Sequence, residues 1–289
     1  MYRSGITESA SQPGGAVGAH PIQTPAARYN FDIFNARGVP KEQLNGTPYR
    51  YWHAHAIAHI FGKRLSGNVD VLDAGGRDGR TLSLLKGLGL HGTYTCLDLK
   101  PTMAVTSDPD FEIETIASAF KDFSPRRCYD AVLFQTSLEC VKDYREIAWV
   151  AGCLKPRGFV VATLHRRNTR RLYRSYRKEG GLYPRNEGEL APAFAEIGLQ
   201  VMELFALGGV ASRLCQYVTN SGLAYYPQAA FRHTAGRVFP ELRHANLMGP
   251  VNQVLNPLMA RIDRVLHFRP IGHCLLLEPA SENGLAPGV

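Results

Sequence analysis

The sequence predicts an α/β fold in which a mostly parallel sheet is covered by helices on both faces. Between residues 69 and 207, short apolar runs alternate with stretches whose apolar residues recur at spacings of three and four. The apolar runs do not alternate with polar residues, which is typical of parallel strands buried on both faces. The first run stops in glycine after Ala74, as a strand does before a tight turn. These observations favour a single layered α/β domain.

The elements can be placed along the chain from the same patterns. The predicted strands span residues 69–74, 93–97, 111–116, 129–134, 159–164, 199–207 and 274–277. The predicted helices span residues 43–65, 81–88, 144–154 and 187–197. Residues 1–28, rich in Gly, Ala, Ser and Pro, predict a flexible arm before a domain at 29–289. Residues 209–270 contain many aromatic residues and no clear strand, which predicts a helical insertion.

The composition is that of an ordinary soluble domain, with 45% hydrophobic and 20% charged residues among 289. The net charge of +8 favours anionic partners only weakly. No apolar run approaches the roughly 18 residues that span a bilayer, and no signal peptide is present, so we expect a cytoplasmic protein. The six cysteines form no close pair, which predicts buried reduced thiols rather than disulfides or a zinc site. No feature predicts an oligomeric state.

The turn after the first strand has the composition of a ligand-binding loop. Asp73 ends the strand, and Gly75, Gly76 and Gly79 open the next helix. Glycine lets the backbone approach a ligand closely, and a helix N-terminus attracts negative charge. The spacing is not the GxGxxG of dinucleotide sites, because Arg77 stands where that pattern needs glycine. This argues against a nicotinamide oxidoreductase.

With this loop, the chain resembles the class I S-adenosylmethionine-dependent methyltransferases, in particular the small-molecule enzymes of the type 11 kind. Their first motif has an acidic residue, one further residue and then GxGxG, and Arg77 replaces the middle glycine here. Asp98 ends the second strand, as the ribose-binding acid does in the family. Three later segments also resemble family motifs in the family order, and they are Tyr129–Phe134, Ser137–Val141 and Leu154–Gly158. The resemblance covers residues 68–207 and the last strand.

The resemblance implies a doubly wound, Rossmann-like sheet of seven strands, mostly parallel with the last strand antiparallel. It also implies S-adenosylmethionine as cofactor, with both ribose hydroxyls held by Asp98. Relatives often hold the adenine with an aspartate, where this chain has Ser118 beside Ala119, and Asp122 is an alternative. The cofactor-binding residues that we expect are Asp73, Gly75, Gly76, Arg77, Gly79, Asp98, Leu99, Ser118, Ala119 and Gln135. The Arg77 side chain can crowd the methionine end of the cofactor.

Methyl transfer aligns a nucleophile with the methyl carbon, and a hydroxyl or carbon nucleophile also needs a base. Cys140 stands where many relatives have a histidine, which removes one common base. His165 ends the fifth predicted strand, on the rim where the acceptor should bind, and is the candidate catalytic base. The alternative is a polar residue on this rim without a catalytic role. Glu139 is expected to pack or cap nearby. 

Other residues near this edge have ordinary explanations. His53, His55 and His59 lie on the first long helix, where a metal would lack further ligands, so we expect a solvated or hydrogen-bonded helix face and no metal. The neighbouring Tyr49, Tyr51 and Trp52 fit core packing better than cofactor contact.

Residues 166–178 form a basic run, and together with His165 seven of fourteen residues are Arg or Lys. The run can bind an anionic acceptor, follow a nucleic-acid backbone or form a solvated helix face. We predict a methyltransferase (EC 2.1.1.-) that acts on oxygen, nitrogen or carbon of a small acceptor, either hydrophobic or aromatic, or anionic. The alternatives are an RNA or protein methyltransferase that uses the basic run, and a methyltransferase-like binding protein without transfer activity.

Overall fold

The structure is a computed structural model that describes residues 25–29, 33, 36–44, 46–103, 105–165, 183, 186–220 and 249–280. It contains one eight-stranded sheet in the order β1-β7-β8-β6-β5-β2-β3-β4. The strands are β1 (Arg28–Tyr29), β2 (Asn68–Ala74), β3 (His91–Asp98), β4 (Phe111–Ala117), β5 (Tyr129–Gln135), β6 (Leu154–His165), β7 (Leu199–Leu207) and β8 (Gly272–Pro279). Only β8 runs antiparallel to its neighbours, β6 and β7.

The α/β fold class and the antiparallel last strand are therefore confirmed, but the expected number of strands, seven, is too low. The additional strand is β1, which pairs in parallel with the edge strand β7 over two residues. Arg28, expected at the end of the flexible arm, lies in this strand and pairs with Glu203. A two-residue strand has no apolar pattern of its own, so only its pairing reveals it.

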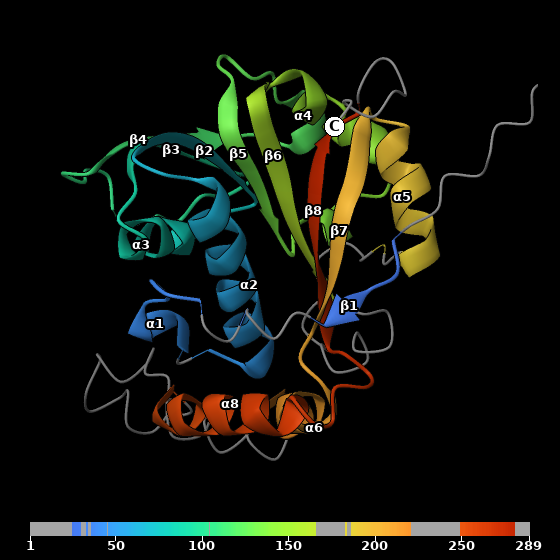
Figure 1. Cartoon of the computed structure of the whole chain (residues 1–289). Helices are drawn as coiled ribbons and strands as arrows, with labels where there is room; N and C mark the ends of the chain where they lie inside the picture. Colours follow the sequence, from blue (N-terminus) through green and yellow to red (C-terminus); the bar gives the residue numbers. More distant parts are fainter. Residues whose placement is uncertain are drawn as a thin grey trace, which may run out of the picture.

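Helices cover both faces of the sheet (Figure 1). They are α1 (Lys41–Leu44), α2 (Pro48–Arg64), α3 (Arg80–Gly87), α4 (Trp149–Gly152), α5 (Glu187–Ala195), α6 (Val210–Asn220) and α8 (Gly249–Asp263). Short 3-10 turns also connect these elements, and they are η2 (Phe120–Asp122), η3 (Leu138–Cys140) and η4 (Tyr144–Ile147). The helix expected over 43–65 begins only at Pro48, because proline is favoured in the first turn and lacks the amide that would continue an earlier helix.

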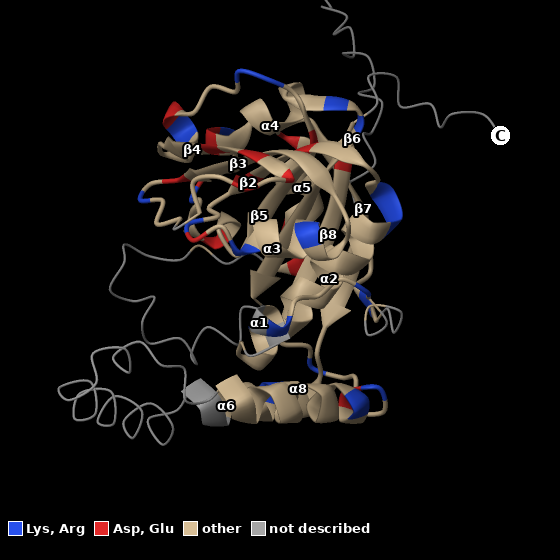
Figure 2. Cartoon of the chain, turned by 90° about the vertical axis from the view of Figure 1, so that its left-hand side faces the viewer, with Lys and Arg blue, Asp and Glu red and all other residues tan. Residues whose placement is uncertain are grey.

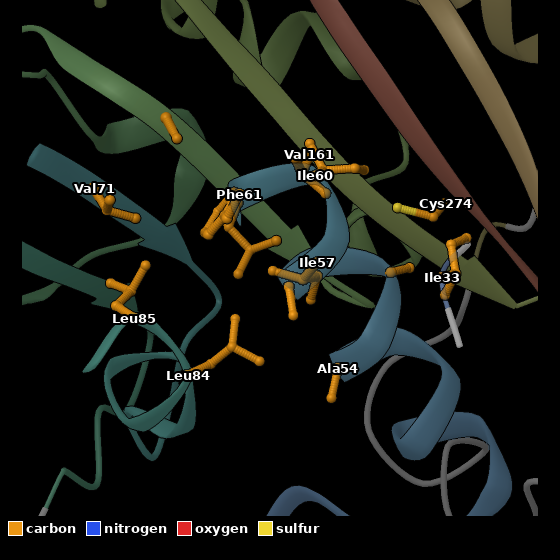
Figure 3. Close-up of a cluster of buried hydrophobic side chains, with 14 of the residues drawn as sticks. Ile33, Ala54, Ile57, Ile60, Phe61, Val71, Leu84, Leu85, Val161 and Cys274 are labelled. Carbon is orange, nitrogen blue, oxygen red and sulfur yellow. The ribbon is translucent and has the colours of Figure 1, made fainter. Parts of the chain in front are cut away.

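The helix α2 fills one face of the core. Its side chains Ile57 and Phe61 meet Leu84 of α3 and Val161 of β6, as Figure 3 shows. Tyr49, Tyr51 and Trp52 are also buried in this layer, as core packing predicts. A second cluster packs α5 and the turns after β5 against the opposite face. Among the cysteines, Cys96, Cys153, Cys215 and Cys274 are buried, whereas Cys128 and Cys140 are exposed, so the expectation of buried thiols holds for four of the six.

Two boundaries differ from the sequence prediction. The helix expected over 144–154 is only a 3-10 turn and the four residues of α4. The strand expected over 159–164 extends back to Leu154, because Leu154 pairs with Tyr129 across a bulge in the ladder. Within that bulge Arg157 has a φ of 68°. The Lys-Pro-Arg-Gly turn is thus absorbed into β6 as an irregular stretch of strand.

Within the expected insertion at 209–270, the described residues form α6 and α8, which lie side by side along one end of the sheet (Figures 1 and 2). This is the end where β5, β6 and β7 finish. Residues 221–248 lie outside the described residues. No helix among the described residues is long and apolar enough to cross a membrane.

Candidate functional site

The candidate site lies at the carboxyl ends of the central strands. From β2 the chain proceeds outward through β3 and β4, and it then returns to add β5 and β6 on the other side of β2. The direction of the sheet order therefore reverses between β2 and β5, which is where open α/β sheets bind ligands. Asp73, near the end of β2, pairs with Cys96 of β3 and Leu133 of β5, so it stands at this reversal.

The loop after β2 has no room for side chains at its glycines. A Cβ atom on Gly75, whose φ is 88°, would lie 2.3 Å from the Cβ of Ser137. A Cβ on Gly76 would lie 2.6 Å from the Asp73 carboxylate. The start of the loop is held to β3, because the Gly75 amide donates to the Leu97 carbonyl at 2.6 Å. The sequence therefore builds a backbone cradle here, as the glycine spacing predicts.

Arg77 takes the place of a glycine in this cradle and adopts a backbone conformation that glycine favours. Its φ of 34° lies in the left-handed region, which costs a side-chain-bearing residue about 1–2 kcal/mol. The amide of Thr102 donates to its carbonyl at 2.7 Å and holds this conformation. The side chain itself is exposed. The backbone thus tolerates the departure from the family motif, and crowding of the cofactor by the Arg77 side chain stays a prediction.

Asp73 is an acid held in an apolar environment, with 1% of its surface exposed. The Tyr94 hydroxyl donates to its Oδ2 at 2.7 Å, whereas Oδ1 has no hydrogen bond of normal geometry among the described residues. Burial raises the pKa of Asp73 from its ordinary 3.8 to about 6, although Thr81 and Tyr94 oppose the shift. The carboxylate is charged at neutral pH, and the oxygen without a partner can accept a ligand donor or a water.

Asp98 at the end of β3 is placed to accept hydrogen bonds from a ligand. Its Oδ1 accepts from the Lys100 amide at 2.8 Å, and its Oδ2 makes no hydrogen bond within the described part of the chain. The Ser118 amide donates to the Asp98 carbonyl at 3.1 Å, which brings Ser118 and Ala119 beside Asp98. Leu99, the next residue, is 71% exposed. An exposed leucine at this edge provides an apolar surface for a ring.

The adenine-side residues divide into two groups. The Ser118 hydroxyl donates to the Ala119 carbonyl at 3.0 Å, so the Ser118 side chain is engaged with the backbone. Asp122 is exposed in η2, farther along the chain from the strand end. Gln135 ends β5 on the other side of β2 and is partly buried. The expected residues on the loop after β2, at the end of β3 and after β4 thus lie together at the carboxyl ends of these strands.

His165, at the end of β6, forms a buried pair with Glu139. Each side chain is only 3% exposed, and the His165 Nδ1 lies 2.9 Å from Glu139 Oε1. The same carboxylate also accepts the His165 backbone amide. Tyr49 of α2 stacks on the imidazole, with ring centroids 3.5 Å apart and planes 12° from parallel. His165 is therefore buried rather than an exposed polar residue of the rim, because α2 covers the strand end, and its role as the base stays a prediction.

Sequence reasoning also missed the environment of the α2 histidines. The expectation was a solvated or hydrogen-bonded helix face, and His53 and His55 are both buried rather than solvated. The His55 Nδ1 lies 2.9 Å from the Tyr51 carbonyl oxygen, so the hydrogen-bonded alternative holds for His55. Burial lowers the pKa of His53 well below its usual range, and the nearby His165 adds to this. His53 packs against Tyr49 with ring centroids 3.6 Å apart. The physical reason is that α2 is enclosed between the sheet and the α6–α8 layer, so that among residues 48–58 Arg50 alone is exposed.

Two further expectations concern metals and the basic run. In the part of the chain that the structure describes, no group of three or more His, Cys, Asp or Glu residues is arranged to hold a metal ion. The basic run at 166–178 lies outside the described residues.

Comparisons with known proteins agree with this geometry. A family model described as a methyltransferase domain matches residues 46–204, more than half of the chain. A search of curated proteins finds no match. Among solved structures, the fold is similar to a chain in the complex between the Haloferax volcanii Trm112 methyltransferase activator and a methyltransferase. The two share 16% identity with a TM-score of 0.53, over 88% of this chain and 99% of that chain.

Two other solved structures are more distant. The cyclopropane synthase MmaA2 from Mycobacterium tuberculosis shares 12% identity over 85% of this chain and 93% of its own, with a TM-score of 0.49. A protein from Galdieria sulphuraria described as a sarcosine dimethylglycine methyltransferase shares 14% identity over 78% of this chain and 83% of its own, with a TM-score of 0.47. The matched family model, together with a glycine cradle at the reversal of strand order, shows that the chain belongs to the class I S-adenosylmethionine-dependent methyltransferases.

Proposed function

We propose that this protein transfers a methyl group from S-adenosylmethionine to a small-molecule acceptor, an activity of class EC 2.1.1.-. The observation that carries the proposal is that the glycine cradle after β2 lies beside the end of β3, where Asp98 keeps Oδ2 without a hydrogen bond to the described part of the chain. When bound, S-adenosylmethionine supplies a methyl group on a positively charged sulfur. The cradle at Gly75–Gly79 would hold its amino-acid part, and Asp98 would hold its ribose.

The residues present fit this group in charge as well as in shape. Asp73 contributes a charged, buried carboxylate at neutral pH beside the cradle. The Asp98 carboxylate is an acceptor only, and it can take two hydroxyl donors at once. Leu99 and the backbone around Ser118 provide an apolar and hydrogen-bonding surface for the adenine. This arrangement supports S-adenosylmethionine better than a dinucleotide, whose pyrophosphate would meet negative charge.

On the acceptor side, we propose that a hydrophobic or aromatic molecule is bound between the end of β6 and the α6–α8 layer. The support for this location is the pair of stacked, buried rings of Tyr49 and His165 at the end of β6. Enclosure by aromatic rings excludes water and favours an apolar acceptor. The same enclosure disfavours a folded RNA or protein, which needs an open surface.

We further propose that His165 serves as the base and that Glu139 positions it. A neutral imidazole whose Nδ1 donates to Glu139 carries its basic lone pair on Nε2. The carboxylate fixes the ring orientation and stabilises the imidazolium that forms when a proton is accepted. Many relatives have a histidine at the position of Cys140. In this protein His165, at the end of β6, would take over its role.

Calorimetry with S-adenosylmethionine and with S-adenosylhomocysteine tests the central proposal. We expect a one-to-one heat signal with both ligands and none with NAD or NADH. S-adenosylhomocysteine lacks the transferred methyl group, so its binding isolates the cradle and ribose contacts. Absence of heat for both at high micromolar concentration would contradict the proposal, provided that the protein melts cooperatively in the same buffer.

The roles of the buried pair are tested with Glu139→Gln and His165→Gln in an assay for S-adenosylhomocysteine release during an acceptor screen. We expect each substitution to lower kcat by roughly 10²–10⁴-fold, the usual contribution of a positioned base, while the affinity for S-adenosylhomocysteine stays within about twofold. Glu196→Gln, which alters an exposed acid that pairs with Arg145 at 3.4 Å, is the matched control. Equal kcat in the wild type and in both variants would assign the pair a purely structural role.

A further inference from the structure

The two helices α6 and α8 have a reversed polarity, with their polar side chains facing the protein. Five such side chains are 3% exposed or less, and they are Ser212, Gln216, Asn252, Asn256 and Asp263. In an ordinary surface helix the buried stripe is apolar and the solvent face is polar. Both the buried polar face and the exposed apolar face of these helices therefore need a physical explanation.

On the inner face, the reason is hydrogen bonding. Asp263 accepts from the amides of Gly209 and Ala211, at 2.8 and 2.9 Å, and so caps the start of α6. Three further bonds tie the helices to α2 and its flank, and they are Trp52 Nε1 to Ser212 Oγ at 2.8 Å, the Tyr49 amide to Gln216 Oε1 at 3.0 Å and Asn256 Nδ2 to the Gly46 carbonyl at 2.9 Å. Directional bonds of this kind fix which face of each helix points inward.

On the outer face, apolar side chains are turned to the surroundings. Val254 is 71% exposed, Val265 is 77% exposed and Leu214 is 64% exposed. We call the outer surface the α6–α8 face, and its apolar members are Leu214, Tyr217, Val251, Val254, Leu258, Ile262 and Val265. The members from α8 and its end recur at spacings of three and four, so they form one continuous stripe. A continuous exposed stripe of this length marks a contact surface, unlike single exposed residues.

The exposed charge on this layer is positive. Among its described residues, 207–220 and 249–271, the only acid is Asp263, and it is buried. Arg261, Arg264 and Arg269 are exposed at the C-terminal end of α8. Figure 2 shows most of α8 without charge and the basic residues gathered at that end. The surface thus combines an apolar stripe with a basic border.

We propose that the α6–α8 face binds the surface of an anionic lipid membrane. An apolar stripe with basic residues beside it is the composition of helices that lie in the plane of the membrane interface. The valine and leucine side chains would enter the acyl boundary, and the arginines would meet lipid phosphates. Tyr217 and the exposed Phe268 are amphipathic or aromatic residues of the kind found at headgroup level.

A second copy of the chain is a poorer occupant of this face. A twofold contact places the same patch on both partners, so the arginine borders would meet each other and like charges would repel. An anionic bilayer offers both an apolar layer and negative charge. No described helix can span a bilayer, so the contact would be peripheral.

This contact would also orient the candidate site. The α6–α8 layer lies at the sheet end where β6 finishes with His165 (Figure 1). The membrane would then adjoin the acceptor side, and an apolar acceptor could arrive from the bilayer. This consequence rests on the proposed function, whereas membrane binding itself does not.

Vesicle flotation of the full chain tests the proposal. We expect the protein to float with vesicles of phosphatidylcholine and phosphatidylglycerol at least tenfold more than with pure phosphatidylcholine, and less at raised salt. The double substitution Val254→Glu with Val265→Glu should lower flotation about tenfold or more, because it places charge in the stripe. Met202→Glu, at a 42% exposed apolar position on β7, should change it less than about twofold by the same reasoning.

Two controls separate the outcomes. The double variant should retain its melting temperature and its heat signal with S-adenosylhomocysteine, since both positions are outside the core. Failure of flotation with every vesicle, or equal flotation of the double variant, would overturn the proposal without affecting the methyltransferase assignment. Concentration-dependent dimers in sedimentation that the double variant abolishes, without flotation, would instead make the face a protein interface and would also overturn it.

Discussion

The substitution Asp98→Ala is expected to weaken binding of S-adenosylmethionine and S-adenosylhomocysteine by about a hundredfold. A hydrogen bond to a charged group contributes about 1.5–3 kcal/mol, and the carboxylate would accept from two ribose hydroxyls. Losing about 3 kcal/mol corresponds to roughly a hundredfold in Kd. The fold should survive, because Asp98 is only half-buried and its main internal bond is to the Lys100 amide at 2.8 Å.

Calorimetry with S-adenosylhomocysteine measures this change directly. Asp98→Asn should fall between the wild type and the alanine variant, since the amide keeps one acceptor oxygen. Asp110→Ala, which removes an exposed acid before β4 at the opposite, amino-terminal ends of the strands, is the control and should bind as the wild type does. Unchanged affinity in Asp98→Ala would refute the ribose role.

The second large effect is expected from Asp73→Asn, which should stabilise the protein at neutral pH. Burial raises the pKa of Asp73 in the folded protein from 3.8 to about 6. The folded state therefore binds this proton more tightly than the unfolded state, so the contribution of Asp73 to stability is complete below pH 3.8. It is lost as the pH rises through 6. A shift of about two pKa units corresponds to about 3 kcal/mol.

Thermal unfolding from pH 4.5 to 7.5 tests this linkage. The difference in melting temperature between Asp73→Asn and the wild type should grow with pH, reaching roughly 5–10 °C for a domain of this size. Asparagine can still accept from the Tyr94 hydroxyl, which limits the disturbance. The same variant should bind S-adenosylmethionine more weakly, because the negative charge beside the cradle is lost.

The substitution Asp70→Asn on the same strand is a control whose effect on stability should depend on pH in the opposite direction. Burial pushes the pKa of Asp70 upward, but the hydrogen bond and charge of Lys155, at 2.5 Å, outweigh it and lower the pKa. Its carboxylate therefore stabilises the fold above its unfolded pKa, and the effect is lost as the pH falls. A difference in melting temperature between Asp73→Asn and the wild type that does not change with pH would show that burial does not raise the pKa of Asp73.

The sheet was largely predictable because its signals are local. Buried parallel strands such as β2 and β5 are uninterrupted apolar runs, and this signal survives without knowledge of their neighbours. The strands most in error were those whose limits depend on pairing, namely β1 and the first residues of β6. Pairing across the sheet joins residues far apart in the chain, so no local pattern contains it.

The residues of the cofactor site were predictable for the same reason, whereas the contacts on the proposed acceptor side were not. The positions of Asp73, the glycines and Asp98 follow from where single strands end. The pair of His165 with Glu139 joins residues 26 apart, and Tyr49 completes it from α2. The resemblance of the segment Ser-Leu-Glu-Cys to a family motif pointed to Glu139. Its partner His165 lies at the end of β6, and that segment contains no sign of it.

By itself, the sequence determined the order of strands and helices, the glycine cradle and the acidic residues at two strand ends, because each depends on neighbours in the chain. Only the tertiary structure decided that His53 and His165 are buried and that the polar side of α8 faces inward. Periodicity shows that a helix has two faces, but which face is enclosed depends on the layers that meet it. At α8 the hydrogen bonds of Asn256 to the Gly46 carbonyl and of Asp263 to the Gly209 and Ala211 amides determine which face is inward, and they leave an apolar face outward.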